Sequence, residues 1–113
     1  MPFIDCKISK KLTEEQKESI KSELGKSISL MRKPESYLMV GICDNYDLWF
    51  AGKRATSGAF VSVSVFGSVN SAESERMTAA ICNTLTSVAG LDGREIYVTY
   101  QGINNWGFDG GNF

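Results

Sequence analysis

The chain has 113 residues, of which 42% are hydrophobic and 22% are charged, and its formal net charge is −1. This length and composition predict one soluble globular domain, and the near-zero charge predicts no nucleic-acid surface and no polybasic membrane anchor. No stretch reaches the roughly 20 apolar residues of a membrane helix and no secretory signal opens the sequence, so we expect a cytoplasmic protein without membrane insertion.

The first 43 residues predict a strand, a helix and a second strand. Apolar side chains recur along residues 2–9, which favours a strand, and the apolar run 37–43 favours another. Between them, the sequence Thr-Glu-Glu-Gln that begins at Thr13 is a capping box with acidic residues at the positive end of the helix dipole. A helix is therefore expected to begin there. Its apolar stripe consists of Ile20, Leu24, Ile28 and Met31.

The same order of elements is predicted after a connection over residues 44–58. Residues 59–66 alternate with a period of two, and residues 94–100 are rich in aromatic and β-branched side chains, so both favour strands. Within the connection, residues 48–50 predict a short additional strand. A second helix is expected after Asn70, with an apolar stripe of Met77, Ile81, Leu85 and Val88.

The two sets of elements form an internal repeat. Each residue of the first stripe precedes its counterpart in the second by 57 positions, as Ile20 precedes Met77. This offset predicts two tandem β-α-β units, over about 2–43 and 59–100, within one domain that spans 1–113. Because each helix provides a crossover, the strands of one unit should be parallel. We therefore predict an α/β (α+β) fold, in which one four-stranded mixed sheet carries two helices on one face.

The other face of this sheet is expected to be partly polar. Alternation in 59–66 places Ser62 and Ser64 on one side of the strand and apolar residues on the other. A partly polar face favours a subunit interface over a dry core. The residues that we expect on this face are Phe3, Val61, Val63 and Val65, or those that alternate with them.

The composition excludes several kinds of catalytic site. The chain has no histidine, which removes the Ser-His and Cys-His nucleophiles and the usual zinc sets. Its three cysteines, Cys6, Cys43 and Cys82, are far apart and form no Cys-x-x-Cys motif. We expect free and mostly buried thiols, with no disulfide framework and no metal site.

The dipeptide Met1-Pro2 is a candidate catalytic feature. Removal of Met1 is expected before a small second residue, and it leaves a secondary amine on Pro2. An α-amino group has an ordinary pKa of about 8, and burial or a nearby cation lowers it, so this amine could be a neutral base at pH 7. The alternative is a Met-Pro start that has no consequence.

Two other segments have both a structural and a functional interpretation. Lys33-Pro34 follows the first helix and is typical of a helix end, but a lysine there could also bind a carboxylate near the N-terminus.

Residues 104–113 are rich in glycine and contain three aromatic side chains. They do not form a phosphate-binding loop, because they do not follow a strand and open a helix. They could cover a sheet edge or form the wall of a small apolar pocket.

Several segments match one known family in order and spacing. They are Met1-Pro2, Gly25 with Lys33-Pro34-x-x-Tyr37, Phe50-Ala51-Gly52, Phe66-Gly67, Arg94-x-Ile96-Tyr97-Val98, and the closing Gly107-Phe108-x-Gly-x-Asn112-Phe113. Together with the doubled β-α-β plan, these segments resemble the macrophage migration inhibitory factor family of the tautomerase superfamily. The resemblance spans essentially the whole chain.

The resemblance implies a keto–enol tautomerase that needs no cofactor and acts on α-keto acids such as phenylpyruvate. Pro2 matches the catalytic N-terminal proline, which moves a proton between carbon and oxygen, and Lys33 matches the lysine that binds the substrate carboxylate. Phe66 stands in place of an isoleucine in a turn whose backbone contacts substrate. Other matched residues are Tyr97, which the adjacent subunit supplies in the family, and the aromatic residues around the pocket mouth, Tyr37, Phe108 and Phe113.

The chain also departs from the family pattern. Thr99 stands where mammalian members have a substrate-binding asparagine, and Phe108 replaces a common tryptophan. The Cys-x-x-Cys motif of the family is absent, so a thiol oxidoreductase activity is not expected.

Family members are trimers in which three sheets line a central barrel, so the resemblance implies a homotrimer with active sites between subunits. The alternative function is that of a cytokine-like protein that binds a cell-surface receptor and has weak or vestigial tautomerase activity. The sequence leaves open secretion without a signal peptide. It also leaves open a purely structural domain.

Overall fold

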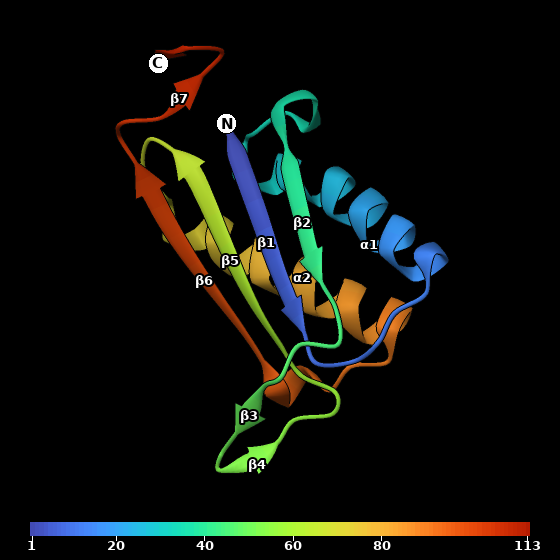
Figure 1. Ribbon diagram of the computed structural model, residues 1–113. Helices are drawn as coiled ribbons and strands as arrows, with labels where there is room; N and C mark the ends of the chain where they lie inside the picture. The colour runs from blue at the N-terminus through green and yellow to red at the C-terminus, as the bar shows by residue number, and fades with distance from the viewer.

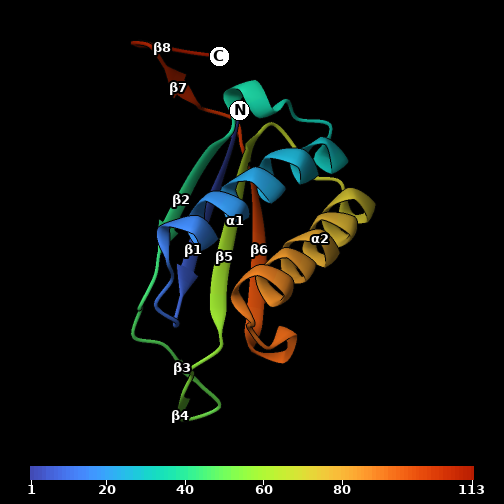
Figure 2. The same cartoon turned by 90° about the vertical axis from the view of Figure 1, so that its right-hand side faces the viewer.

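A mixed four-stranded sheet forms the centre of the computed structural model, which describes residues 1–113. The strand order is β2-β1-β5-β6. Both helices cover the same face of this sheet, as predicted (Figure 1 and Figure 2). The bounds of these elements are Pro2–Ile8 for β1, Glu14–Ser27 for α1, Met39–Cys43 for β2, Ala59–Phe66 for β5, Ser71–Ala89 for α2 and Ile96–Ile103 for β6.

The pairing of the strands confirms the predicted directions. β1 is parallel to β2, and β5 is parallel to β6, because in each pair a helix carries the chain back to the starting edge. The two central strands, β1 and β5, are antiparallel, and Pro2 lies opposite Val65. The first residue of β1 therefore lies beside the last residues of β5.

Both helices begin at side-chain caps. The Thr13 hydroxyl accepts a hydrogen bond from Gln16 N at 3.1 Å, and Gln16 Oε1 accepts one from Thr13 N at 2.9 Å, which confirms the capping box. Asn70 caps α2 by accepting from Glu73 N. After α1 the chain tightens into a 3₁₀ turn, η1 (Ile28–Met31), so the first apolar stripe continues past the end of the helix. All its residues are buried, whereas Val88 of the second stripe is half-buried.

The sequence left open whether the valines of 59–66 or the residues that alternate with them lie on the uncovered face, and the structure places the alternates there. Val61, Val63 and Val65 are fully buried under the helices. Strand register explains this result, since directly paired residues lie on the same face of a sheet and Phe3 is paired with Ser64 rather than with a valine. The uncovered face thus carries the alternates, with Phe3 beside the serines.

Two of the predicted strands have different bounds in the structure. A 3₁₀ turn, η2 (Glu35–Tyr37), precedes β2, which therefore begins at Met39 rather than at residue 37. Another 3₁₀ turn, η3 (Gly93–Glu95), precedes β6, and β6 continues to Ile103. Backbone hydrogen bonds with β5 along its whole length account for this extension, because residues as far as Ile103 have partners there.

Two small hairpins lie at opposite ends of the sheet (Figure 1). The predicted extra strand is β3 (Trp49–Phe50), and it is paired with β4 (Lys53–Arg54). At the other end, β7 (Gly107–Phe108) is paired with β8 (Gly111–Asn112) near the N-terminus of the chain.

The cysteines are free, as predicted, but their burial differs. Cys6 is buried and Cys82 is half-buried, whereas Cys43 is exposed at the end of β2. The expectation of mostly buried thiols therefore fails for Cys43, because β2 is an edge strand. None of the helices combines the length and the apolar character needed to cross a bilayer.

Candidate active site

Pro2 begins β1, and its side chain is fully buried. The antiparallel pairing of β1 with β5 brings this end of the chain to the turn that follows β5. There the backbone N–H of Phe66 donates a hydrogen bond to the carbonyl oxygen of Met1 at 2.9 Å. The N-terminus is thus attached to the turn for which the family resemblance implies a backbone contact with substrate.

Lys33 also binds the backbone of Phe66, at its carbonyl group. Arg32 ends η1 in the left-handed conformation, with φ of 58°, and Lys33 follows it. The Lys33 ammonium then donates a hydrogen bond to the carbonyl oxygen of Phe66 at 3.1 Å. Phe66 therefore has its N–H bound by Met1 and its C=O bound by Lys33.

Burial and the charge of Lys33 both favour a neutral amine at the N-terminus. The pKa of the Met1 α-amino group lies below its ordinary value of 8.0, first because the group is partly removed from water and second because Lys33 is positively charged. No acidic side chain lines the adjacent cavity. The environment is suited to a base rather than to a permanent cation.

A cavity of about 440 Å³ opens beside Pro2. Tyr37 and Phe108 form part of its wall, and their rings meet edge to face with centroids 5.9 Å apart. Tyr37 belongs to η2, whereas Phe108 belongs to β7, so residues far apart in the sequence enclose the same space. An apolar cavity with few polar groups is typical of a small-molecule site.

The C-terminal hairpin extends this aromatic cluster. Phe113 packs against Phe66, with ring centroids 5.6 Å apart, and stacks on Phe108 at 5.8 Å. The N–H of Phe113 donates to the carbonyl oxygen of Trp106 at 3.0 Å, which closes the hairpin. The glycine-rich tail thus forms a wall of the cavity instead of only covering a sheet edge.

Tyr97 and Thr99 lie apart from Pro2 in this chain. Tyr97 is paired with Phe60 near the start of β5, whereas Pro2 is paired with Val65 near its end. The Tyr97 side chain is 63% exposed and meets Phe50 of the β3–β4 hairpin, with ring centroids 5.5 Å apart. Thr99 is also exposed and is paired with Ser62. The predicted residues that one chain brings together are Pro2, Lys33, Tyr37, Phe66, Phe108 and Phe113.

Sequence reasoning did not identify every residue of the cavity. Trp106 and Met39 line it, and the Met39 side chain is 67% exposed, although it lies on a strand that reads as apolar. Trp106 could have been noted as an aromatic residue among glycines, but no sequence signal reveals the orientation of its ring. Phe3, Ser36 and Leu38 also contribute to the lining.

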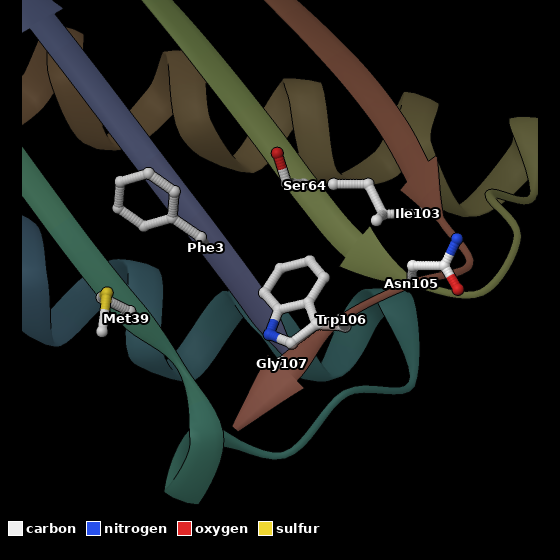
Figure 3. A pocket seen from close by; sticks show the side chains of 7 residues that line it. All are labelled: Phe3, Met39, Ser64, Ile103, Asn105, Trp106 and Gly107. Atoms are coloured by element: carbon white, nitrogen blue, oxygen red, sulfur yellow. The ribbon is translucent and has the colours of Figure 1, made fainter. Parts of the chain in front are cut away.

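A second cavity, of about 320 Å³, lies next to the first on the uncovered face of the sheet. Figure 3 shows Phe3, Ser64 and Ile103 around its open area, with the indole of Trp106 on one side. No group of three or more His, Cys, Asp or Glu side chains is placed to hold a metal ion.

Comparisons with known proteins agree with this geometry. No curated protein matches the sequence significantly. Among solved structures, MIF2 of Leishmania major has a TM-score of 0.93 and 27% identity, covering 100% of this chain and 97% of that chain. The MIF-like protein of Entamoeba histolytica has a TM-score of 0.89 and 29% identity, covering 99% and 98% of the two chains.

The fused 4-OT wild-type asymmetric trimer R7 shares the fold at 16% identity, with a TM-score of 0.85 and coverage of 97% and 94%. The family model described as macrophage migration inhibitory factor (MIF) matches residues 1–113. The chain therefore belongs to the MIF family.

Proposed function

We propose that this protein is a keto–enol tautomerase of small aromatic α-keto acids such as phenylpyruvate, and that the amine of Pro2 is its base after removal of Met1. The observation that carries the proposal is the position of Pro2. Its ring is buried and lines an apolar cavity together with Tyr37 and Phe108, and the charge of Lys33 acts on the adjacent Met1 amine. Family membership supports the same function.

Removal of Met1 would also change the hydrogen bonding of Phe66. The Phe66 N–H now donates to the Met1 carbonyl, so loss of Met1 leaves this N–H free. It lies on the same residue whose carbonyl oxygen binds Lys33. An ammonium has three N–H donors, so Lys33 keeps two for another acceptor. We propose that these donors together bind the carboxylate of the substrate.

The proposed reaction is a one-base proton transfer. In the keto direction, the neutral Pro2 nitrogen takes the proton from the enol oxygen and returns it to the carbon that follows the carbonyl group. In the enol direction the same nitrogen removes the carbon proton, the electron pair moves onto the carbonyl oxygen, and the protonated nitrogen then gives the proton to that oxygen. Lys33 stabilises the negative charge of the intermediate. A positioned base of this kind contributes about 10²–10⁴-fold to the rate.

We also propose that the active form is a homotrimer. Tyr97 and Thr99 are far from Pro2 in their own chain, so they can contact substrate only at the site of another subunit. The partly polar sheet face and the two projecting hairpins are surfaces that such an assembly would cover. The fused 4-OT protein of the same fold, which is a trimer, supports this arrangement by analogy.

The test is phenylpyruvate turnover by protein whose loss of Met1 has been verified by mass spectrometry. We expect absorbance to report enol–keto conversion, and we expect Pro2→Gly or one additional N-terminal residue to abolish it. Size-exclusion chromatography with light scattering would establish the assembly. A folded, processed trimer that does not convert phenylpyruvate would contradict the proposed substrate and would favour the receptor-binding alternative.

A further inference from the structure

Four aromatic rings form a continuous series from η2 to the end of β5. Tyr37 meets Phe108 edge to face, with ring centroids 5.9 Å apart, and Phe108 stacks on Phe113 at 5.8 Å. Phe113 in turn packs against Phe66, with centroids 5.6 Å apart and ring planes inclined at 44°. Phe113 is thus the ring that connects the C-terminal hairpin to the turn after β5.

This series joins the same two segments as the hydrogen bond of Lys33. Tyr37 follows Lys33 by four residues, and the Lys33 ammonium donates to the carbonyl oxygen of Phe66 at 3.1 Å. The segment 33–37 is therefore connected to Phe66 directly through one hydrogen bond and indirectly through the rings of the hairpin. Because the two connections form a closed path, the position of Phe66 relative to Lys33 depends on both.

Few backbone bonds hold the Phe66 turn (residues 66–67). The bond from Phe66 N–H to the Met1 carbonyl, at 2.9 Å, is lost when Met1 is removed. The bond from Gly67 N–H to the carbonyl oxygen of Ile103, also at 2.9 Å, remains. Gly67 has φ of 93°, and a Cβ added to it would meet nothing within 4 Å, so this residue contributes no packing. The Phe66 side chain is therefore the part of the turn that packing can fix.

Phe113 is held in place independently of Phe66. Its N–H donates to the carbonyl oxygen of Trp106 at 3.0 Å, and its ring stacks on Phe108. Its side chain is 55% exposed in the single chain and lies outside the buried core. The ring can therefore be replaced to test its effect on Phe66 without removing a core residue.

We propose that Phe113 is a positioning residue for the carboxylate site: its ring fixes the Phe66 side chain and thereby aims the freed Phe66 N–H and the Lys33 ammonium at one carboxylate. This inference rests on the proposed function for the presence of a carboxylate on the ligand. Phe113 acts through Phe66 and needs no contact with the reacting atoms. A simple wall of the cavity would instead affect charged and uncharged ligands alike.

The experiment compares a charged and an uncharged ligand on the same variants, after Met1 removal. Phenylglyoxylate carries a carboxylate, and phenylglyoxamide carries a neutral amide of about the same size in its place. Neither ligand has a hydrogen on the carbon that follows the ketone group, so calorimetry reports binding without tautomerisation. The readout is the acid-to-amide ratio of affinity.

Phe113→Leu keeps an apolar side chain but removes the ring. We expect the acid-to-amide ratio to fall by about fivefold or more, a part of what a hydrogen bond to a charged group contributes. Phe66→Leu should lower the ratio similarly. The double variant should lower it no further than the larger single effect, because both changes break the same contact.

Two further variants serve as controls. Phe113→Tyr retains the ring and should retain the ratio. Phe60→Leu alters an exposed phenylalanine at the opposite end of β5 and should leave the ratio unchanged. Light scattering of each variant would establish that the assembly is that of the parent chain.

A second measurement detects the turn itself without a ligand. Amide hydrogen exchange at Gly67 reports how often its hydrogen bond to Ile103 opens. Exchange should be faster by about threefold or more in Phe113→Leu than in the parent chain, because the turn is then held less firmly. It should be unchanged in Phe60→Leu.

An unchanged acid-to-amide ratio in folded Phe113→Leu would overturn the proposal, as would unchanged exchange at Gly67. An equal loss of affinity for both ligands would also overturn it, since that result is expected of a simple wall. The two proposals can fail separately. If the parent chain does not convert phenylpyruvate but the ratio falls as expected, the tautomerase proposal fails and the role of Phe113 stands. If the parent chain binds the acid no more tightly than the amide, or binds neither, the role of Phe113 is refuted whatever the turnover.

Discussion

The Lys33 ammonium donates a hydrogen bond to the carbonyl oxygen of Phe66 over 3.1 Å, and this contact joins the segment after α1 to the end of β5. The two residues are 33 positions apart in the sequence. Their contact places a positive charge next to the N-terminal amine, whose pKa is lowered by burial and by that charge. Lys33 thus biases the N-terminal amine toward its neutral form, and in the proposed function it also binds the substrate carboxylate.

Replacement of Lys33 by methionine should impair both roles. The positive charge of Lys33 lowers the pKa of the Met1 amine in the unprocessed chain, and we expect it to act in the same direction on the Pro2 amine after Met1 removal. If the neutral Pro2 amine is the base, as proposed, loss of the cation should move the acid limb of the kcat/KM profile to higher pH. Loss of the proposed hydrogen bond from the Lys33 ammonium to the substrate carboxylate should also lower kcat/KM for phenylpyruvate by about 10- to 100-fold. Lys26→Met, which removes an exposed lysine of α1, is the control and should leave the profile in place. A Lys33→Met profile with an unshifted acid limb would contradict the electrostatic role.

Subunit mixing should test the placement of Tyr97. Pro2→Gly and Tyr97→Ala homotrimers should each have little activity. Trimers refolded from an equal mixture should recover about a quarter of the parental activity, because in a cyclic trimer a quarter of the sites combine an intact Pro2 with a neighbour's intact Tyr97. Activity measured against the mixing ratio provides the readout. If Tyr97 acted within its own chain, mixing would restore nothing.

Two glycines should respond in opposite ways to alanine. At Gly25, an added Cβ would overlap only the end of the exposed Glu35 side chain, which can move aside, so the better helix propensity of alanine should stabilise the chain by about 0.5–1 kcal/mol. At Gly102, the Cβ would overlap the backbone carbonyl of Gly67, which cannot move without displacing the turn after Phe66. This change should destabilise by about 1–3 kcal/mol and reduce turnover. Urea unfolding of the two variants measures the difference, and equal effects would refute the steric interpretation.

The buried Cys6 thiol should make stability depend on alkaline pH. Burial, and then the nearby Asp5, raises its pKa from 9.0 to about 12. An acid whose pKa is raised by folding contributes stability that is complete below its unfolded pKa and is lost as the pH rises toward the folded value. The parent chain should therefore lose stability between pH 9 and about 12 relative to Cys6→Ala. The measurement is the denaturant midpoint of both proteins across this pH range. Midpoints that fall in parallel with rising pH would contradict the role of the Cys6 thiol.

Much of the architecture could be predicted from the sequence because it depends on local patterns. The capping box at Thr13, the apolar stripe from Ile20 to Met31 and the alternation in 59–66 each follow from interactions between residues close in the chain. The offset between the stripes identified two similar units, and their strands are parallel as expected. Where a pattern was interrupted, as at η2 before Met39, the predicted strand began too early.

The choice between the two faces of the sheet depended on register. Whether Phe3 shared a face with the serines or with the valines could not be known until β1 was aligned with β5, since a slip of one residue exchanges the faces. The contact of Phe113 with Phe66 likewise results from the path of the C-terminal hairpin and not from a motif.

The sequence by itself determined the β-α-β order, the helix caps and the candidate roles of Pro2 and Lys33, because periodicity, capping and motif spacing are properties of short segments. Only the tertiary structure decided that Lys33 binds the carbonyl oxygen of Phe66 while Met1 binds its N–H. It also decided that Tyr97 lies at the far end of the sheet from Pro2. The physical reason is that these relationships depend on strand pairing across 30 or more residues, and such pairing is set by the burial of the whole core.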